Sequence, residues 1–165
     1  MAPDPQTPLG FGKHNHAKCV ADALALADTR CAERGLRLTP VRRKVLELLL
    51  QEHRALGAYA ILDLLRKEGF ASQPPVAYRA LEFLSENGFV HKIERLNAFI
   101  ACHHPEEGHL PVFMICRVCD TVAETHSGPA DKALISAASA EGFQIEHTVV
   151  EAKGVCPTCA KSASA

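Results

Sequence analysis

The stretch PPVAYRALEFLSENGFVHKIERLNAFIAC, from Pro74 to Cys102, decides the fold of this chain. It opens with a pair of prolines, which suit the first turn of a helix, and continues with apolar residues at helical spacing up to Gly88. Beyond Gly88 the residues are rich in strand formers on both sides of a turn at 95–97, which predicts a hairpin. A helix that leads directly into a hairpin is typical of a winged helix-turn-helix domain.

Further helices are predicted upstream of this stretch. Residues 17–35 carry apolar residues at helical spacing and end at Gly35, and residues 58–69 end in the same way at Gly69. Residues 39–50 begin with Thr39 as a favourable N-cap, followed by Pro40 at the first helical position. Together with 72–102 they predict an N-terminal winged helix-turn-helix domain over residues 1–103. Residues 1–16, rich in proline and glycine, are expected to form a loose arm.

The residues after the hairpin alternate between strand and helix patterns. Strands are predicted at 112–116 and 121–125, a helix at 129–142 and a last strand at 143–156, whereas the SASA end at 162–165 is expected to be loose. This pattern predicts a small α/β domain over residues 109–165, joined to the first domain by a hinge at 104–108. The fold class expected for the chain is therefore α+β.

The composition limits the classes of protein that the chain fits. Its 165 residues are 47% hydrophobic and 22% charged, which favours folded domains with real cores over a disordered chain. No apolar run is long enough to span a membrane and no secretory signal is visible, so a cytoplasmic protein with no membrane partner is expected. Residues 1–94 carry a net charge of +2 and residues 95–165 one of −3, which permits a basic nucleic-acid face in the first part.

Four of the seven cysteines form two Cys-x-x-Cys pairs, in ICRVCD at 115–120 and VCPTCA at 155–160. In a reducing compartment such pairs indicate metal or redox chemistry rather than disulfides. Two such turns bring four thiolates to the spacing of a tetrahedral zinc site, which predicts a structural zinc ion. The predicted ligands are Cys116, Cys119, Cys156 and Cys159. Independent redox dithiols or reduced buried cysteines are the alternatives, and Cys19 and Cys31 are expected to be core thiols.

A second set of ligand types lies on both sides of the expected hinge. Its members are His91 in the first hairpin strand, Cys102 at the end of the hairpin, His109 beyond the hinge, and Glu124 in the strand after the first Cys-x-x-Cys pair. One thiolate, two imidazoles and one carboxylate suit zinc and disfavour calcium or magnesium. An ion held by ligands from both domains would fix the angle between them. The alternative is that each residue has an ordinary place in the core or on the surface.

Several segments together resemble the ferric uptake regulator family, most closely its zinc uptake branch. They are RLTPVRRKVLELL, AYAILDLLR, PPVAYRALEFLSENGFVHKIE, FMICRVCDTVAE and HTVVEAKGVCPTC, spread from about Cys31 to Cys159. The resemblance implies that the second domain is a dimerisation domain and that a metal-loaded homodimer represses genes by binding palindromic operator DNA. It also implies two zinc ions per chain. The four Cys-x-x-Cys thiols would hold the structural ion, and His91, Cys102, His109 and Glu124 would hold the regulatory ion.

The resemblance also implies which residues contact DNA. They are Arg42, Tyr59, Tyr78 and Arg79. The AYRAL segment is similar to the recognition helix of the family, so Tyr78 and Arg79 are expected to meet bases and backbone in the major groove. Arg42 is expected to contact phosphate. An ordinary solvated helix face is the alternative. The chain departs from the family at Val76, where threonine is common, and at Gly57, where serine is common and would cap the helix.

These observations predict a zinc-responsive repressor of zinc uptake genes that is not an enzyme and has no small-molecule substrate. A sensor of iron, manganese or peroxide with the same fold is one alternative, which the soft thiolate of Cys102 disfavours. A zinc-dependent deaminase is another, because His104 and Glu106 form an H-x-E element, but Val155 stands where that signature has proline. A third metal site is left open among His14, His16, His103, His104, His126 and His147.

Overall fold

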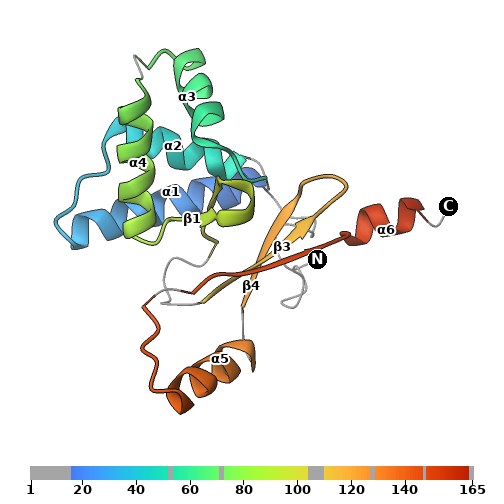
Figure 1. Cartoon of the computed structure of the whole chain (residues 1–165). Coiled ribbons are helices and arrows are strands. Elements are labelled where there is room, and N and C mark those ends of the chain that lie inside the picture. Colours follow the sequence, from blue (N-terminus) through green and yellow to red (C-terminus); the bar gives the residue numbers. More distant parts are fainter. Residues whose placement is uncertain are drawn as a thin grey trace.

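The computed structural model describes residues 16–51, 54–70, 73–103, 110–126, 129–146 and 148–163. The first half contains α1 (His16–Glu33), α2 (Pro40–Gln51), α3 (Ala58–Lys67), α4 (Pro74–Glu86), β1 (Val90–Ile93), the 3-10 turn η1 (Glu94–Leu96) and β2 (Ala98–Ala101). The second half contains β3 (Pro111–Cys116), β4 (Val122–His126), α5 (Pro129–Ala140), β5 (Val150–Gly154) and α6 (Pro157–Ala163). The fold is α+β, as expected, with α1 to α4 gathered on one side of the strands and α5 on the other (Figure 1).

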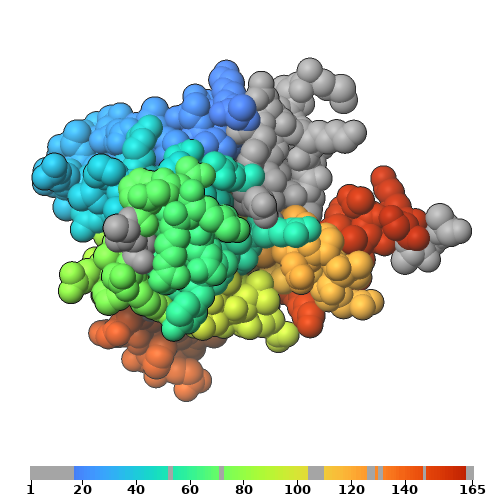
Figure 2. Space-filling view, turned by 90° about the horizontal axis from the view of Figure 1, so that it is seen from above, coloured from blue at the N-terminus to red at the C-terminus, as the bar shows by residue number. Residues whose placement is uncertain are grey.

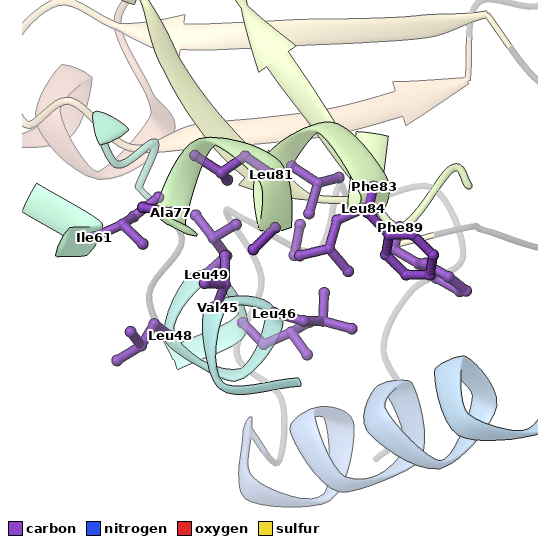
Figure 3. Close-up of a cluster of buried hydrophobic side chains, with 14 of the residues drawn as sticks. Val45, Leu46, Leu48, Leu49, Ile61, Ala77, Leu81, Phe83, Leu84 and Phe89 are labelled. Carbon is purple, nitrogen blue, oxygen red and sulfur yellow. The ribbon is translucent and has the colours of Figure 1, made fainter. Parts of the chain in front are cut away.

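The core of the first half lies between α2 and α4. Val45 and Leu49 of α2 face Leu81 and Leu84 of α4, and all four side chains are buried (Figure 3). α1 and α3 add their own apolar stripes to the same core. Their buried residues are Leu24, Ala27 and Cys31 on α1 and Ala58, Ile61, Leu62 and Leu65 on α3. The helix-turn-helix is therefore a packed unit that holds the outer face of α4 towards solvent.

Local sequence signals set the helix boundaries. The Thr39 hydroxyl accepts a hydrogen bond from the Arg42 N–H at 3.5 Å, as expected of an N-cap residue. Gly57 precedes α3 with no side-chain cap, as its lack of a hydroxyl predicts. Gly88 follows α4 with φ +75°, a left-handed conformation that glycine adopts without strain, and the chain then enters β1.

The segment from β1 through η1 to β2, residues 90–101, forms the wing. β1 and β2 pair antiparallel, with His91 opposite Ile100. Asn97 closes the turn with φ 45°, a left-handed conformation that asparagine tolerates better than most residues. Leu56 and Phe99 exchange two backbone hydrogen bonds of 2.8 Å, so the connection between α2 and α3 lies along the outer side of β2. This is the winged helix-turn-helix that the sequence predicts.

The second half is built on a three-stranded sheet in the order β4-β3-β5. β4 runs antiparallel to β3 and β5 runs parallel to it, with Cys116 of β3 opposite Gly154 of β5. The two Cys-x-x-Cys turns therefore leave the sheet at the same end. A backbone bridge between Arg54 and Thr121 ties the segment after α2 to the start of β4.

The wing and the sheet share a second hydrophobic core. Its buried members are Ile93 and Ile100 from the wing and Phe113, Ile115 and Val122 from the sheet. The view from above shows the wing in contact with the β3 and β4 region (Figure 2). The docking of wing on sheet is thus an apolar interface of strand residues and not a loose contact between two separate bodies.

Three expectations about the ends of segments are wrong. The last strand covers only Val150–Gly154, because its ladder with β3 runs from Val150 opposite Val112 to Gly154 opposite Cys116, and none of the described residues before Val150 pairs with β3. α6 extends into the end that was expected to be loose, starting at Pro157, a favourable first helical residue. α1 begins at His16, inside the expected arm. The rest of the arm and the hinge at 104–108 lie outside the described residues.

α5 carries apolar side chains into solvent. Leu134 is 40% exposed, Ile135 is 59% exposed, and Phe143 just after the helix is 68% exposed. Together with Ile145 and neighbouring residues, Leu134 and Phe143 line an apolar hollow of about 560 Å³. Large apolar side chains gathered at one surface mark a candidate interaction surface. Among the described helices, none is long and apolar enough to cross a membrane.

Candidate metal centres and nucleic-acid interface

The two Cys-x-x-Cys turns converge at one end of the sheet. Cys116 is the last residue of β3, Cys119 lies in the turn after it, Cys156 follows β5, and Cys159 lies in the first turn of α6. The four sulfur atoms lie within 4.8 Å of one another, and Cys119 Sγ is 3.8 Å from Cys156 Sγ. Zn–S bonds of about 2.3 Å in a tetrahedral site place sulfur atoms about 3.7 Å apart. The geometry therefore fits a four-thiolate zinc site.

Hydrogen bonds within the cluster shift the pKa values of three of its thiols, two downwards and one upwards. The Cys156 N–H donates to Cys116 Sγ at 3.3 Å and, with other N–H groups of the turn, lowers the pKa of the Cys116 thiol to about 6. The Thr121 hydroxyl, 3.2 Å from Cys119 Sγ, lowers the pKa of Cys119. The thiols of Cys156 and Cys119 raise the pKa of Cys159 to about 12. Remaining thiol protons must leave when a metal binds, so metal binding at this cluster depends on pH.

A second group of ligand atoms joins the wing to the sheet. His91 Nε2 lies 3.4 Å from Glu124 Oε1, and Cys102 Sγ lies 3.8 Å from the same oxygen. The Glu124 side chain is only 1% exposed, and its Oε2 accepts a hydrogen bond of 2.9 Å from the His103 N–H. That N–H orients the carboxylate so that Oε1 faces the imidazole and the thiol. Burying a carboxylate is costly, and a bound cation is one of the few partners that offset this cost.

The second predicted set of ligands, His91, Cys102, His109 and Glu124, is called the mixed site below. The structure brings together three of these four residues. The ligand atoms of His91, Cys102 and Glu124 lie within 4.8 Å of one another, close enough for one zinc ion. His109, the fourth, lies outside the described residues. The His91 ring is held against the ring of Phe113, with centroids 5.6 Å apart. One nitrogen, one sulfur and one oxygen donor fit zinc better than calcium or magnesium.

Other ligand-type residues do not form a third group within the part of the chain that the structure describes. His103 is half-buried and contributes its N–H to Glu124. His14, His104 and His147 lie outside the described residues, as do the side chains of His16 and His126. Cys31 is a core thiol as expected, whereas Cys19 is only half-buried, and burial raises the pKa of both.

Two residues at these centres were not predicted. Phe113 and Ile115 are two positions apart on β3, and this spacing places both side chains on the same, inward face of the strand. Nothing in the sequence, however, links the Phe113 ring to His91. Thr121 contacts Cys119 because the turn after Cys119 folds back, with Asp120 in the left-handed region at φ 58°. Neither contact has a spacing that could be read from the sequence.

The residues expected to contact DNA lie on the exposed side of the helix-turn-helix. Tyr59 at the start of α3 is 69% exposed and Tyr78 on α4 is 48% exposed, although large aromatic side chains are usually buried more deeply. Arg79 is exposed beside Tyr78. Val76 is half-buried, whereas its neighbour Ala77 is in the core. An exposed tyrosine and arginine on one helix are the residue types that contact thymine and guanine in the major groove.

Arg42 is tied to the protein as well as facing the surface. Its guanidinium carbon lies 3.6 Å from the centre of the Phe83 ring, and its Nη1 donates to the Arg37 carbonyl at 2.7 Å. A hollow of about 240 Å³ between α2 and α4 is lined by Arg42, Val76 and Arg79 among others. Two arginines on one hollow beside an exposed helix suit a DNA phosphate.

Comparison with known proteins gives matches over most of the chain. The model of the ferric uptake regulator family matches residues 33–153. The zinc uptake regulation protein of Escherichia coli (strain K12) is 40% identical over 139 residues, which cover 84% of this chain and 81% of that protein. A zinc uptake regulator complexed with zinc and DNA is 38% identical, with a TM-score of 0.85, and the match covers 88% of this chain and 98% of that one.

Two crystal structures of a further protein, XcZur, match unequally. Its holo form is 42% identical, with a TM-score of 0.79 over 85% of this chain and 98% of that one. Its apo form is 40% identical, with a TM-score of only 0.52 over 87% of this chain and 99% of that one. Since the identity and coverage hardly differ, the lower score comes from a different conformation. The arrangement of this chain is similar to that of the holo form.

Proposed function

The chain belongs to the ferric uptake regulator family, and from this premise we propose that it is a zinc-responsive transcriptional repressor. It binds palindromic operator DNA as a homodimer and controls zinc uptake genes. The observation that carries the proposal is the convergence of His91, Cys102 and Glu124, which brings ligand atoms of the wing and the sheet to one point. The likeness to the holo form of XcZur, and to a zinc uptake regulator bound to zinc and DNA, supports it.

In this proposal the four-cysteine cluster is the structural site. Cys116, Cys119, Cys156 and Cys159 keep one zinc ion under all conditions. They connect the ends of β3 and β5, two strands that are far apart in the sequence. Zinc in such sites supplies a cross-link that small domains use in place of a large core. The cluster therefore maintains the sheet on which the wing docks.

The mixed group is the regulatory site, with His109 as its fourth ligand. His91 and Cys102 belong to the wing and its end, whereas Glu124 belongs to the sheet, so the three side chains meet only when wing and sheet are docked as observed. A ligand that needs all of them selects this docked arrangement. Because α4 leads through Gly88 into β1, a fixed wing also fixes the direction of α4.

A homodimer would give two copies of α4 a fixed separation. The exposed apolar side chains on and after α5, including Ile135 and Phe143, support a protein interface in this part of the chain. Two helix-turn-helix units related by a two-fold axis read two half-sites of a palindrome, spaced about 34 Å or a multiple of it apart. Tyr78, Arg79, Arg42 and Tyr59 are the proposed contacts.

Operator binding at buffered metal concentrations tests the proposal. Purified protein that retains its structural zinc is titrated onto a fluorescent operator duplex in zinc, manganese(II), iron(II) or a zinc chelator. We expect zinc to tighten binding at least about 5-fold over the chelator, within the range of about 5- to 150-fold that is usual for coupled sites. Equal affinity in zinc and in chelator would contradict the proposal. Tighter binding with iron or manganese than with zinc would favour a sensor of those metals.

A catalytic zinc site receives less support. Cys156 and Cys159 are gathered with two further cysteines, and four thiol ligands leave no open position for a reactive water. The H-x-E element, His104 and Glu106, lies outside the described residues. The family is one of transcription regulators.

A further inference from the structure

Glu124, Phe113 and Glu151 form one row across the three-stranded sheet. Phe113 on β3 is opposite Glu124 on β4 and opposite Glu151 on β5. Directly opposed residues of paired strands point to the same face of a sheet. Glu124 and Phe113 both face the wing, because they contact His91. Glu151 therefore points to the wing as well, from the strand on the other side of Phe113.

The Glu151 carboxylate accepts two backbone hydrogen bonds from the wing. Its Oε1 lies 2.7 Å from the Glu94 N and its Oε2 lies 3.3 Å from the Arg95 N. These N–H groups begin the 3-10 turn η1 and have no partner within that turn. A hydrogen bond from an N–H group to an ionised carboxylate is about twice as strong as one to a neutral acceptor. The two bonds join residues 57 and 56 positions apart in the sequence.

The strand that carries Glu151 is itself fixed at its end. The Gly154 carbonyl at the end of β5 accepts a hydrogen bond of 2.9 Å from the Arg117 N–H. Cys156, two residues further on, joins the four-cysteine cluster. The four-cysteine cluster therefore fixes the end of β5, the strand that carries Glu151. Glu124 lies on β4, the other edge strand, and belongs to the mixed site.

We propose that Glu151 is a positioning residue that docks the wing on the sheet independently of metal and so presents His91 and Cys102 to Glu124. This inference rests on the proposed function of the mixed site as the regulatory site. Two carboxylates of one row act at two places on the wing: Glu151 binds the turn between its strands, and Glu124 meets His91 and Cys102. Docking by Glu151 reduces the conformational freedom that regulatory zinc binding would otherwise remove, which raises zinc affinity.

Three variants of the full chain, each with structural zinc in place, test the inference. Glu151→Gln removes the charge and one acceptor oxygen. Glu94→Pro removes an N–H donor where proline is tolerated, because it is the first residue of η1 and Ile93 before it is already extended. Glu94→Ala is the matched control, since it removes the same side chain and keeps the N–H, losing only an exposed contact with Lys92. Hydrogen exchange of the Arg95 amide by NMR reports the docking, and competition with a chromophoric chelator reports the affinity of the exchangeable zinc.

We expect the Arg95 amide to exchange at least about tenfold faster in Glu151→Gln and Glu94→Pro, and the exchangeable zinc to bind about tenfold more weakly in both. Glu94→Ala should keep both values within about twofold of the unsubstituted chain. Unchanged exchange in Glu151→Gln would overturn the docking contact. Faster exchange with unchanged zinc affinity in both variants would overturn the positioning role. Loss of structural zinc in both variants would also overturn it, because Glu151 would then serve folding instead.

The same measurements separate this inference from the proposed function. If the unsubstituted chain has no exchangeable zinc, or if that zinc leaves operator binding unchanged, the proposed function fails. The Arg95 exchange rate then still decides whether Glu151 docks the wing.

Discussion

Glu124 and Glu151 lie on either side of Phe113 in one row across the sheet, and both carboxylates meet the wing. Glu124 approaches an imidazole and a thiol, whereas Glu151 accepts two backbone N–H groups. One carboxylate is therefore suited to an exchangeable cation and the other to permanent hydrogen bonds. In the proposed function, both carboxylates set the position of the wing, which connects α4 to the sheet.

Cys102→Ser is expected to remove the exchangeable zinc and to leave the structural zinc in place. Serine keeps the size of this buried residue but replaces a thiolate by a poor zinc ligand, so we expect zinc affinity at the mixed site to fall by more than about 100-fold. Zinc titration with a chromophoric chelator measures the loss, and operator binding should no longer respond to zinc. Cys19→Ser is the matched control, because Cys19 belongs to neither ligand group. An unchanged zinc response in Cys102→Ser would exclude the thiol as a ligand.

Cys116→Ser is expected to disrupt the second half of the chain. It removes one of four thiols that connect β3 to β5, so zinc should be lost during purification and the sheet should lose order. Zinc content by mass spectrometry and near-UV circular dichroism measure the two effects. A variant with full zinc content and an unchanged spectrum would show that the cysteine cluster is not a structural zinc site.

Phe113→Ala is expected to destabilise the interface between wing and sheet. Phe113 is fully buried, and truncation of a buried phenylalanine costs about 3–5 kcal/mol in the free energy of unfolding. Since its ring also holds His91, zinc affinity at the mixed site should fall as well. Denaturant unfolding with the exchangeable zinc chelated measures the loss of stability. The additional stability gained when that zinc is bound measures its affinity. Phe113→Leu should lose much less of either, and a loss below about 1 kcal/mol in Phe113→Ala would contradict the observed core.

Much of the fold could be predicted because it depends on local patterns. Apolar spacing, Pro40, Pro74 and the glycines at helix ends indicate the helices, and the change of period at Gly88 indicates the wing. The limits of β5 could not be predicted, because they depend on which residues of β3 pair with it, and that pairing joins segments that are far apart in the sequence.

The candidate sites divide in the same way. The four-cysteine group is visible in the sequence since each Cys-x-x-Cys pair is local, and the mixed group was named only from ligand types and a family resemblance. Contacts such as the one between Glu151 and the N–H of Glu94 join distant residues through backbone atoms. The pattern of side chains does not show which backbone N–H group will act as a donor, so this contact could be found only in the folded structure.

Arg79→Ala and Arg42→Lys are expected to weaken operator binding for different reasons. Loss of the exposed Arg79 side chain should cost about 1–3 kcal/mol and relax base preference at one position of each half-site. Arg42→Lys keeps the charge but loses the planar group that stacks on Phe83, so affinity should fall with little change in salt dependence. Fluorescence anisotropy over a salt series measures both. Lys161→Ala is the control, because Lys161 lies on α6, which Figure 1 shows on the side of the molecule away from α4. This variant should bind operator DNA with unchanged affinity.

The most direct test of the account counts zinc per chain and measures operator affinity on one sample, before and after mild chelation. We predict about two zinc ions per chain at the start, one of which resists the chelator, and a loss of operator binding that follows the departure of the other. Operator affinity that stays unchanged after the exchangeable zinc has left would contradict the central claim that this ion, held between wing and sheet, controls DNA binding.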